Sequence, residues 1–309
     1  MDDHREMLGT VSAILADDFD VAGIATEGQR APDMARQLQP DVIVLDVDMP
    51  GLNGFETFRA LERGGSGGTP VVFLSMHDAD EIVSEAFRYG GRGYVLKTRV
   101  GRDLPTALNQ ALLGRLFVPS LESLSHLAQT GGHALQVYDG EEPFLDGIAA
   151  FFDLALRRGD ATCVIASPRM RDGLAARLKL RGWDLEGSSG HSRYLAIDAA
   201  AALHGIMRNG LPDTARLEQI LAELDQYRRA VSDGVTSRLT LFGDMVMSLR
   251  DDGNTPALLA IENHWTRLTR GLPFLTLCAY TSSCFHDDES GLWADVCTEH
   301  WAVSHANDV

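Results

Sequence analysis

Residues 41–54 read DVIVLDVDMPGLNG, an apolar run that ends on a carboxylate and passes into a turn. Pro40 precedes the run, and Pro50-Gly51 follows it. A continuous apolar run between turn residues is typical of a strand that is buried on both faces of a parallel sheet. We therefore predict such a strand at residues 41–46, with Asp46 at its carboxyl end.

The sequence around this run alternates between strand and helix patterns. Two further apolar runs follow at 71–74 and 94–96, with helical stretches between them, and a short run at 21–24 precedes them. Strands that alternate with helices predict a doubly wound α/β domain. Pro119 closes this alternation, so we place the first domain at residues 1–118.

A second α/β alternation begins after a polar stretch that ends in Gly131-Gly132. We expect a linker at 119–132 and a second domain at 133–309. The apolar strand patterns of this second domain lie at 161–166, 194–197, 239–242 and 274–279. The predicted fold class is therefore α/β, with two doubly wound domains.

The overall composition limits the classes of partner. The 309 residues include 44 acidic and 27 basic side chains, a net charge of −17. This balance argues against DNA, because affinity for nucleic acids comes largely from basic residues, and it disfavours anionic membranes for the same reason. The sequence has neither a spanning apolar run nor a signal-peptide pattern, and its four cysteines are too sparse for a disulfide scaffold. We expect a cytoplasmic protein.

Three chemically different side chains follow successive predicted strands of the first domain. They are the carboxylate of Asp46, the hydroxyl of Ser75 and the ammonium of Lys97, which is one of only two lysines. The carboxyl ends of parallel strands share one edge of a sheet, so these groups should converge. If Asp2 and Asp3 join them, the crowded carboxylates need a hard cation such as Mg²⁺. Such a site suits phosphoryl transfer to Asp46 as the nucleophile.

In these motifs, residues 2–117 resemble the response-regulator receiver family. The matching positions are the acidic pair, the phosphoacceptor, the switch hydroxyl, the switch aromatic and the invariant lysine: Asp2, Asp3, Asp46, Ser75, Tyr94 and Lys97. The resemblance implies a flavodoxin-like fold and transfer of a phosphoryl group from a sensor histidine kinase to Asp46. It also implies Mg²⁺ bound by Asp3, Asp46 and the backbone carbonyl of Asp48, with water in place of Asp2.

The N-terminus departs from the family pattern. The family has a buried central strand before the acidic pair, whereas this sequence has only Met1 there. An absent central strand leaves unpaired backbone groups on both of its neighbours. We therefore interpret the first strand as missing, with Met1 as one of its residues. We expect an in-frame apolar segment of about six residues, the usual strand length, upstream of the start.

The second domain resembles the MEDS or DcmR-type sensory family, which is distantly similar to RecA/KaiC ATPases. The turn at 166–172 lacks the Gly-Lys-Ser/Thr of a phosphate loop, so ATP hydrolysis of the usual kind is disfavoured. The stretches that carry the resemblance are 133–138, 159–168, 242–246, 273–280 and 297–300. It implies a RecA/KaiC-like fold without a P-loop, and a sensory module for small organic or hydrocarbon-like ligands without established catalysis.

The strand ends of the second domain suggest a ligand crevice. We expect Ser167, Asp198 and Asp244 to face one crevice, with His133 and Tyr138 at its rim. The family usually has Glu at the position of Asp244. The alternative is that Asp198 and Asp244 cap the helices that follow them, as Asp commonly does.

A group of cysteines and histidines near the C-terminus admits two interpretations. These residues are Cys278, Cys284, His286, Cys297 and His300, and their types suit zinc. The paired short spacing of structural zinc sites is missing, however, and Cys278 lies in an apolar strand. We therefore interpret them as structural residues, since buried thiols commonly act as small hydrophobic groups.

These inferences predict a two-component response regulator rather than an enzyme. Phosphorylation of Asp46 would change the surface near Ser75, Tyr94 and Lys97, and would thereby alter either homodimerisation or contact with the sensory domain. We expect the output to be contact with a protein target or a ligand-gated response rather than DNA binding. Two alternatives stay open. One is a docking scaffold whose receiver never takes phosphate, and the other is a small-molecule enzyme that uses Asp198 and Asp244.

Overall fold

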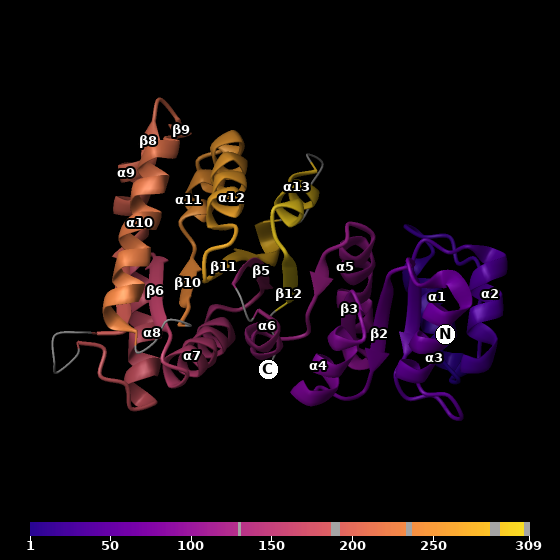
Figure 1. The fold of residues 1–309 in the computed structure, drawn as a ribbon. Coiled ribbons are helices and arrows are strands. Elements are labelled where there is room, and N and C mark those ends of the chain that lie inside the picture. The colour runs from indigo at the N-terminus through magenta and orange to yellow at the C-terminus, as the bar shows by residue number, and fades with distance from the viewer. Residues whose placement is uncertain (129–130, 187–191, 233–236, 285–290, 306–309) are drawn as a thin grey trace. The chain divides into compact units, whose positions relative to one another are not determined.

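Strand β1 (Ile43–Asp46) forms at the predicted apolar run, as seen in a computed structural model of the chain. The structure describes residues 1–128, 131–186, 192–232, 237–284 and 291–305. They divide into two compact units, Met1–Pro119 and Ser120–Val309 (Figure 1). Both units alternate strands and helices around parallel strands, so the predicted α/β fold class is confirmed.

The first unit is built on parallel strands in the order β1-β2-β3-β4. The other strands are β2 (Val71–Ser75), β3 (Gly93–Leu96) and β4 (Leu116–Phe117). The helices are α1 (Arg5–Leu15), α2 (Ala31–Leu38), α3 (Gly54–Leu61), α4 (Asp80–Arg88) and α5 (Val100–Leu112), with short turns η1 (Gly28–Arg30), η2 (Glu62–Ser66) and η3 (Lys97–Arg99). Every residue of β2 is buried, which agrees with its uninterrupted apolar sequence.

Strand β1 is the edge strand of this sheet, and the N-terminus lies along its free edge. The Met1 amine donates to the Val44 carbonyl at 2.6 Å, and the Asp46 N–H donates to the Met1 carbonyl at 2.9 Å. Met1 therefore lies beside β1 in the way that a residue of a paired strand would. Within the described residues, no strand pairs with this edge of β1.

The short run at 21–24 does not form a strand. Its residues are exposed, and a cavity of about 620 Å³ separates this segment from β1. The cavity is lined mainly by apolar side chains, including those of Leu8, Val11 and Leu15 on α1, Met34 on α2 and Ile43 on β1. A strand needs a hydrogen-bonded neighbour, and the described residues place no strand between 21–24 and β1.

The second unit holds a parallel sheet in the order β12-β5-β11-β10-β6-β7. The strands are β5 (Gly132–Tyr138), β6 (Ala161–Ala166), β7 (Tyr194–Asp198), β10 (Leu239–Gly243), β11 (Phe274–Thr281) and β12 (Ala302–His305), and β8 (Met207–Arg208) pairs with β9 (Leu211–Pro212) in a small hairpin. The helices are α6 (Leu121–Leu127), α7 (Glu141–Arg157), α8 (Pro168–Leu180), α9 (Ala199–Ile206), α10 (Thr214–Val231), α11 (Val246–Asp251), α12 (Thr255–Thr269) and α13 (Leu292–Thr298), with the turn η4 (Ser282–Cys284).

The stretch expected as a linker contains helix α6, which belongs to the second unit. Ser120 caps this helix by accepting a hydrogen bond from the Ser123 N–H at 3.1 Å. Leu121 and Leu124 are buried, and α6 packs against α7. The polar composition of this stretch therefore reflects a capped amphipathic helix with one buried face.

Candidate functional site

Asp46, Asp2 and Lys97 meet at the carboxyl edge of the first unit's sheet. The Lys97 Nζ lies 2.7 Å from Asp46 Oδ2 and 2.8 Å from Asp2 Oδ2. Asp46 is the last residue of β1, and Lys97 directly follows β3, so parallel strand ends bring the two together. Both carboxylates are buried, and the Lys97 side chain is 7% exposed.

The burial of this ion cluster shifts its titration. Burial raises the pKa of Asp46 above its usual value, although the hydrogen bond from Lys97 acts in the opposite direction. Burial also disfavours the charged form of Lys97, yet its hydrogen bonds to Asp2 and Asp46 raise the pKa of the ammonium overall. Lys97 is thus held as a permanent cation beside Asp46.

The acidic pair offers oxygen ligands beside Asp46. Asp2, Asp3, His4 and Asp46 each present one ligand atom, and these atoms all lie within 4.8 Å of one another. Carboxylate oxygens are the donors that Mg²⁺ prefers, so the residues present fit this ion. His4 was not predicted as part of the site, yet its Nδ1 lies 3.0 Å from Asp3 Oδ1.

The loop after β1 is fixed around Asp46. The Asp48 N–H donates to Asp46 Oδ1 at 3.1 Å. Asn53 and Glu56 then form a capping box, which starts α3. Gly54 packs so close to the Asp46 carbonyl that a side chain there would collide with it, so glycine is needed at this position.

Ser75 and Tyr94 are connected through the backbone of His77. The Ser75 Oγ donates to Asp48 Oδ2 at 3.3 Å and accepts from the His77 N–H at 3.0 Å. The Tyr94 hydroxyl donates to the His77 carbonyl at 2.7 Å, and its ring is buried. Burial raises the pKa of Tyr94 to about 12. Ser75 and Tyr94 therefore both hold the backbone of His77 in place.

Two of the carboxylates predicted for the second unit's crevice act at helix N-termini. Asp198 caps α9 by accepting from the Ala201 N–H at 3.0 Å, and it forms an ion pair with Arg171 at 2.9 Å. Asp244 accepts from the N–H of Ser167, the N-cap residue of α8, at 3.2 Å. Burial raises the pKa of Asp244 to about 6. Asp198 thus caps α9, the helix that follows it, whereas Asp244 accepts a hydrogen bond at the N-terminus of α8, a helix from another part of the chain.

His133 does not lie at the rim of that crevice, which corrects the sequence expectation. It is the second residue of β5, and it is buried at the amino edge of the sheet, opposite the strand ends that carry Ser167 and Asp244. Tyr138 does end β5, but its ring stacks on Phe144 with centroids 4.0 Å apart. Strand direction explains the difference, because the two ends of one strand face opposite edges.

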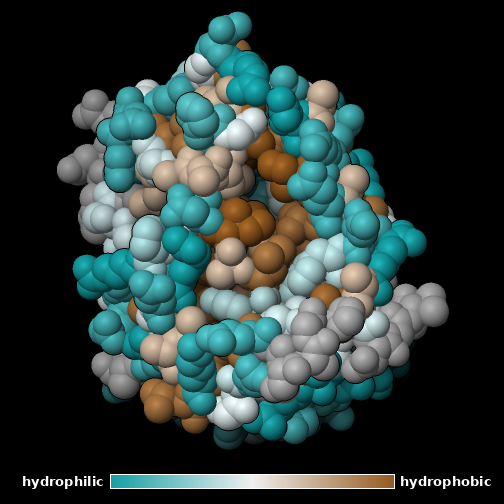
Figure 2. All heavy atoms as spheres, turned by 90° about the vertical axis from the view of Figure 1, so that its left-hand side faces the viewer, coloured by the Kyte–Doolittle hydropathy of each residue, from teal (hydrophilic) through white to brown (hydrophobic). Residues whose placement is uncertain are grey.

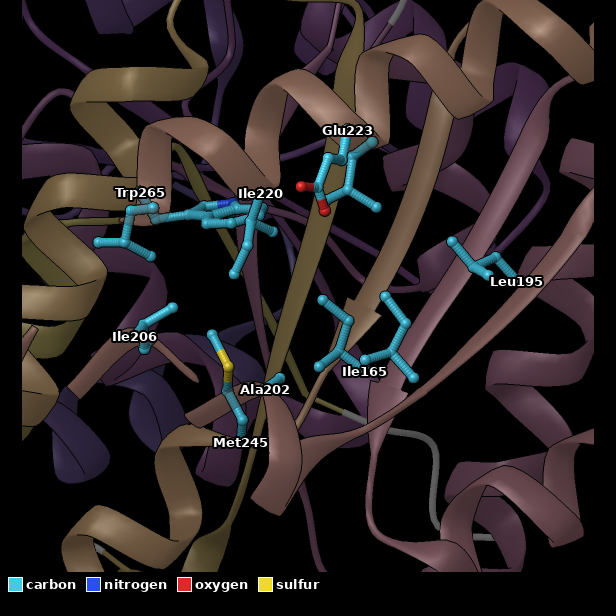
Figure 3. Close-up of a pocket in the computed structure, with 11 residues that line it drawn as sticks. Ile165, Leu195, Ala202, Ile206, Ile220, Glu223, Met245 and Trp265 are labelled. Carbon is cyan, nitrogen blue, oxygen red and sulfur yellow. The ribbon is translucent and has the colours of Figure 1, made fainter. Parts of the chain in front are cut away.

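The second unit contains an apolar cavity of about 220 Å³. Figure 2 shows the corresponding face, where apolar atoms gather in a hollow. In Figure 3, the side chains of Ile165, Ala202, Ile220 and Met245 surround one space, and Trp265 closes one side. The other lining residues are Leu195, Ile197, Ile206, Leu217, Glu223 and Leu224. None of the five residues predicted for a ligand crevice is among them.

Comparison with known proteins identifies the second unit. The sequence profile of the MEDS family (methanogen/methylotroph, DcmR sensory domain) matches residues 132–298, more than half of the chain. The chain belongs to the MEDS family. The apolar cavity therefore lies in the MEDS domain, and the acidic cluster precedes it in a separate unit.

The first unit matches the response regulator receiver domain over residues 1–109. The nitrate/nitrite response regulator protein NarL of Escherichia coli strain K12 is 38% identical over 118 residues, which cover 38% of this chain and 54% of NarL. The transcriptional regulatory protein DesR of Bacillus subtilis is 31% identical over 123 residues, or 39% of this chain and 60% of DesR. The chain spans little more than half the length of these curated relatives. The predicted combination of a receiver with a MEDS domain is confirmed.

Solved receiver structures also align with the first unit. The receiver domain of the putative response regulator NarL from Mycobacterium tuberculosis is 31% identical with a TM-score of 0.35, and the alignment covers 37% of this chain and 93% of that one. Vibrio cholerae CheY4 is 28% identical with a TM-score of 0.34, covering 36% and 92%. Separately, no helix in the described part of the chain has the length and apolar character of a membrane span.

Proposed function

We propose that this protein is a response regulator whose Asp46 accepts a phosphoryl group from a sensor histidine kinase. The observation that carries the proposal is the 2.7 Å contact between Asp46 and Lys97 at a sheet edge with further carboxylates. The similarity of the receiver domain to response regulators supports the same assignment. The net charge of −17 favours protein partners or homodimerisation over DNA as the output.

The chemistry follows from the geometry of the acidic cluster. A carboxylate oxygen of Asp46 forms a bond to phosphorus while the bond between phosphorus and the donor's histidine nitrogen breaks, and that nitrogen keeps the electron pair. Lys97 neutralises negative charge on the acyl phosphate. Asp3, Asp46 and the Asp48 carbonyl would hold Mg²⁺, with Asp2 in the same cluster. When bound, the ion would neutralise charge on the phosphoryl oxygens. Ser75 and Tyr94 then change their contacts with His77, and this changes the surface of the receiver domain near them.

Acetyl phosphate with Mg²⁺ tests this assignment by intact-protein mass spectrometry. The full chain should gain the mass of one phosphoryl group, and Asp46→Asn should abolish the gain because an amide is a poor nucleophile. Asp41→Asn, an exposed carboxylate at the start of the same apolar run, is the matched control and should be modified like the wild type. A wild-type chain that never gains mass would instead indicate a docking scaffold.

We also propose that the MEDS domain binds a small organic ligand in the cavity beneath α10. Ten of the eleven lining residues are apolar, and Glu223 is the charged exception. The volume of about 220 Å³ exceeds the roughly 150 Å³ of a dry protein cavity that accepts benzene. ATP is not the expected ligand, since the turn after β6 reads Ser167-Pro168 and Lys179 lies in the last turn of α8.

Small apolar probes such as benzene and n-pentanol test the cavity. Binding should change the fluorescence of Trp265, which lies in the cavity wall. Ile220→Trp should fill the space and remove binding of n-pentanol, the larger probe. Leu180→Trp, at a side chain that is 88% exposed, should leave n-pentanol binding unchanged. Equal binding by both variants would place the ligand elsewhere.

A further inference from the structure

Four side chains with metal-binding atoms converge in the interior of the MEDS domain. They are His133 of β5, Glu262 of α12, Cys278 of β11 and His300, which follows α13. Their ligand atoms all lie within 4.8 Å of one another, and all four residues are buried. This group is separate from the acidic cluster of the receiver domain and from the residues proposed to bind phosphate.

Four distances within the group lie near the edges of a metal-centred tetrahedron. His133 Nε2 lies 3.1 Å from Cys278 Sγ and 3.3 Å from Glu262 Oε2. Glu262 Oε2 lies 3.5 Å from His300 Nε2 and 3.6 Å from Cys278 Sγ. Zinc bonds of about 2.0–2.3 Å in tetrahedral geometry place neighbouring ligand atoms about 3.3–3.6 Å apart. Three of the four distances fall in this range, and the distance between His133 and Cys278 is shorter.

The partners of the two imidazoles direct their Nε2 atoms to the centre of this group. His300 Nδ1 lies 2.7 Å from the Val296 carbonyl, which can only accept, so Nδ1 carries the proton. Thr266 donates its hydroxyl proton to the Glu299 carbonyl at 2.7 Å and therefore accepts from His133 Nδ1, also at 2.7 Å. In the neutral form of each ring, a proton on Nδ1 leaves Nε2 with a lone pair that faces the centre of the group, the arrangement found around zinc-bound histidines.

The carboxylate is oriented in the same way. The Tyr280 hydroxyl donates to Glu262 Oε1 at 2.5 Å and leaves Oε2 facing both imidazoles and the thiol. Two nitrogen lone pairs and a carboxylate oxygen that face one another in a buried space repel, and either a proton or a metal ion between them removes the repulsion. Two nitrogens, one sulfur and one oxygen form a ligand set that suits Zn²⁺.

We propose that His133, Glu262, Cys278 and His300 form a buried Zn²⁺ site in the MEDS domain. The proposal gives Cys278 and His300 a ligand role in place of the structural one expected from the sequence. Of the other residues considered there, Cys297 is not in the group, and His286 lies outside the described residues. The site adjoins the ligand cavity. Glu262 and Cys278 line a small void, and three other residues of its wall, Ile165, Met245 and Trp265, also line the ligand cavity.

Metal analysis of the untagged full chain, purified without chelators, is the direct test. We expect one zinc per chain by inductively coupled plasma mass spectrometry. After removal of zinc, Co²⁺ should restore one metal per chain with the visible bands of a tetrahedral ion and a thiolate-to-metal charge-transfer band. Cys278→Ser should remove the charge-transfer band, and His300→Gln should weaken binding at least 100-fold. Thr266→Val, which removes the acceptor of His133 Nδ1 and leaves the four ligands unchanged, should weaken binding about 10- to 100-fold.

Cys163→Ser provides the matched control, because Cys163 is a buried thiol of β6 that is not in the group. It should keep one metal and the charge-transfer band. The variants leave the receiver's carboxylates intact, so weak metal binding there appears equally in all of them. Wild-type protein that holds no more Zn²⁺ or Co²⁺ than Cys278→Ser and His300→Gln would overturn the proposal and indicate an imidazolium–carboxylate network instead.

Discussion

Single residues in this protein take their properties from partners far away in the sequence. Asp244 follows β10, yet its carboxylate accepts hydrogen bonds from the N–H of Ser167 at the start of α8. Burial is the largest influence on this carboxylate and raises its pKa from 3.8 to about 6. The protonated form is therefore favoured more strongly in the folded chain than in the unfolded one.

This shift predicts a pH-dependent contribution of Asp244 to stability. Because the folded pKa is raised, the contribution is fully present below about pH 4 and is lost as the pH rises through 6. Between pH 4.5 and 7.5, the wild type should lose roughly 1–2 kcal/mol of unfolding free energy relative to Asp244→Asn, less than the full shift implies because the side chain is partly exposed. Urea unfolding across this range measures the difference. Asp252→Asn, at an exposed carboxylate, is the control and should show the same pH dependence of unfolding free energy as the wild type. If the unfolding free energies of Asp244→Asn and the wild type changed in parallel with pH, the assignment would be contradicted.

At the scale of elements, the free edge of β1 determines what forms around it. The apolar run at 21–24 stays exposed because the cavity of about 620 Å³ lies where a strand would join it to β1. Met1 partly replaces that strand through its bonds to Val44 and Asp46. Burial lowers the pKa of the Met1 amine to about 6, so a charged amine is disfavoured at this position.

Extending the chain before Met1 by about six apolar, β-branched residues should therefore stabilise the receiver domain. The extension replaces the amine by a neutral N–H, pairs with β1 and fills the cavity, and each newly buried side chain contributes about 1.5–3 kcal/mol before the entropy of ordering is subtracted. We expect a net gain of at least about 2 kcal/mol on this scale, measured by urea unfolding. An extension of the same length made of Gly and Ser is the control. Equal stability of the two extended chains would show that the cavity does not accept a strand.

At the scale of the whole molecule, each unit has a core of its own. The first core gathers residues such as Leu45, Phe73 and Tyr94, and one core of the second unit includes Leu241 and Trp265. Each core is formed by residues of one unit alone. A domain with its own core can unfold as a separate cooperative unit.

We therefore expect two thermal transitions by calorimetry, each sensitive to a different ligand. Beryllofluoride with Mg²⁺ should raise only the receiver transition, whereas benzene should raise only the MEDS transition, because a ligand stabilises the unit that binds it. At 100 times its dissociation constant, each ligand should contribute about 2.7 kcal/mol. Asp46→Asn should abolish the first shift and leave the second. A single transition that both ligands raise would show that the units unfold together.

The sequence by itself determined the α/β class and the receiver's acidic cluster. Asp46 and Lys97 could be placed together because each lies at the carboxyl end of an apolar run, and parallel strands bring their carboxyl ends to one edge. The same reasoning misplaced His133. This residue lies at the start of β5 and therefore at the amino edge of the sheet, opposite the edge that carries Ser167 and Asp244. Only the tertiary structure could bring His133, Glu262, Cys278 and His300 together, since they come from separate elements and share no short spacing. The apolar cavity was equally hidden, because each lining residue resembles ordinary core in the sequence, and an unfilled volume depends on how helices and strands pack in three dimensions.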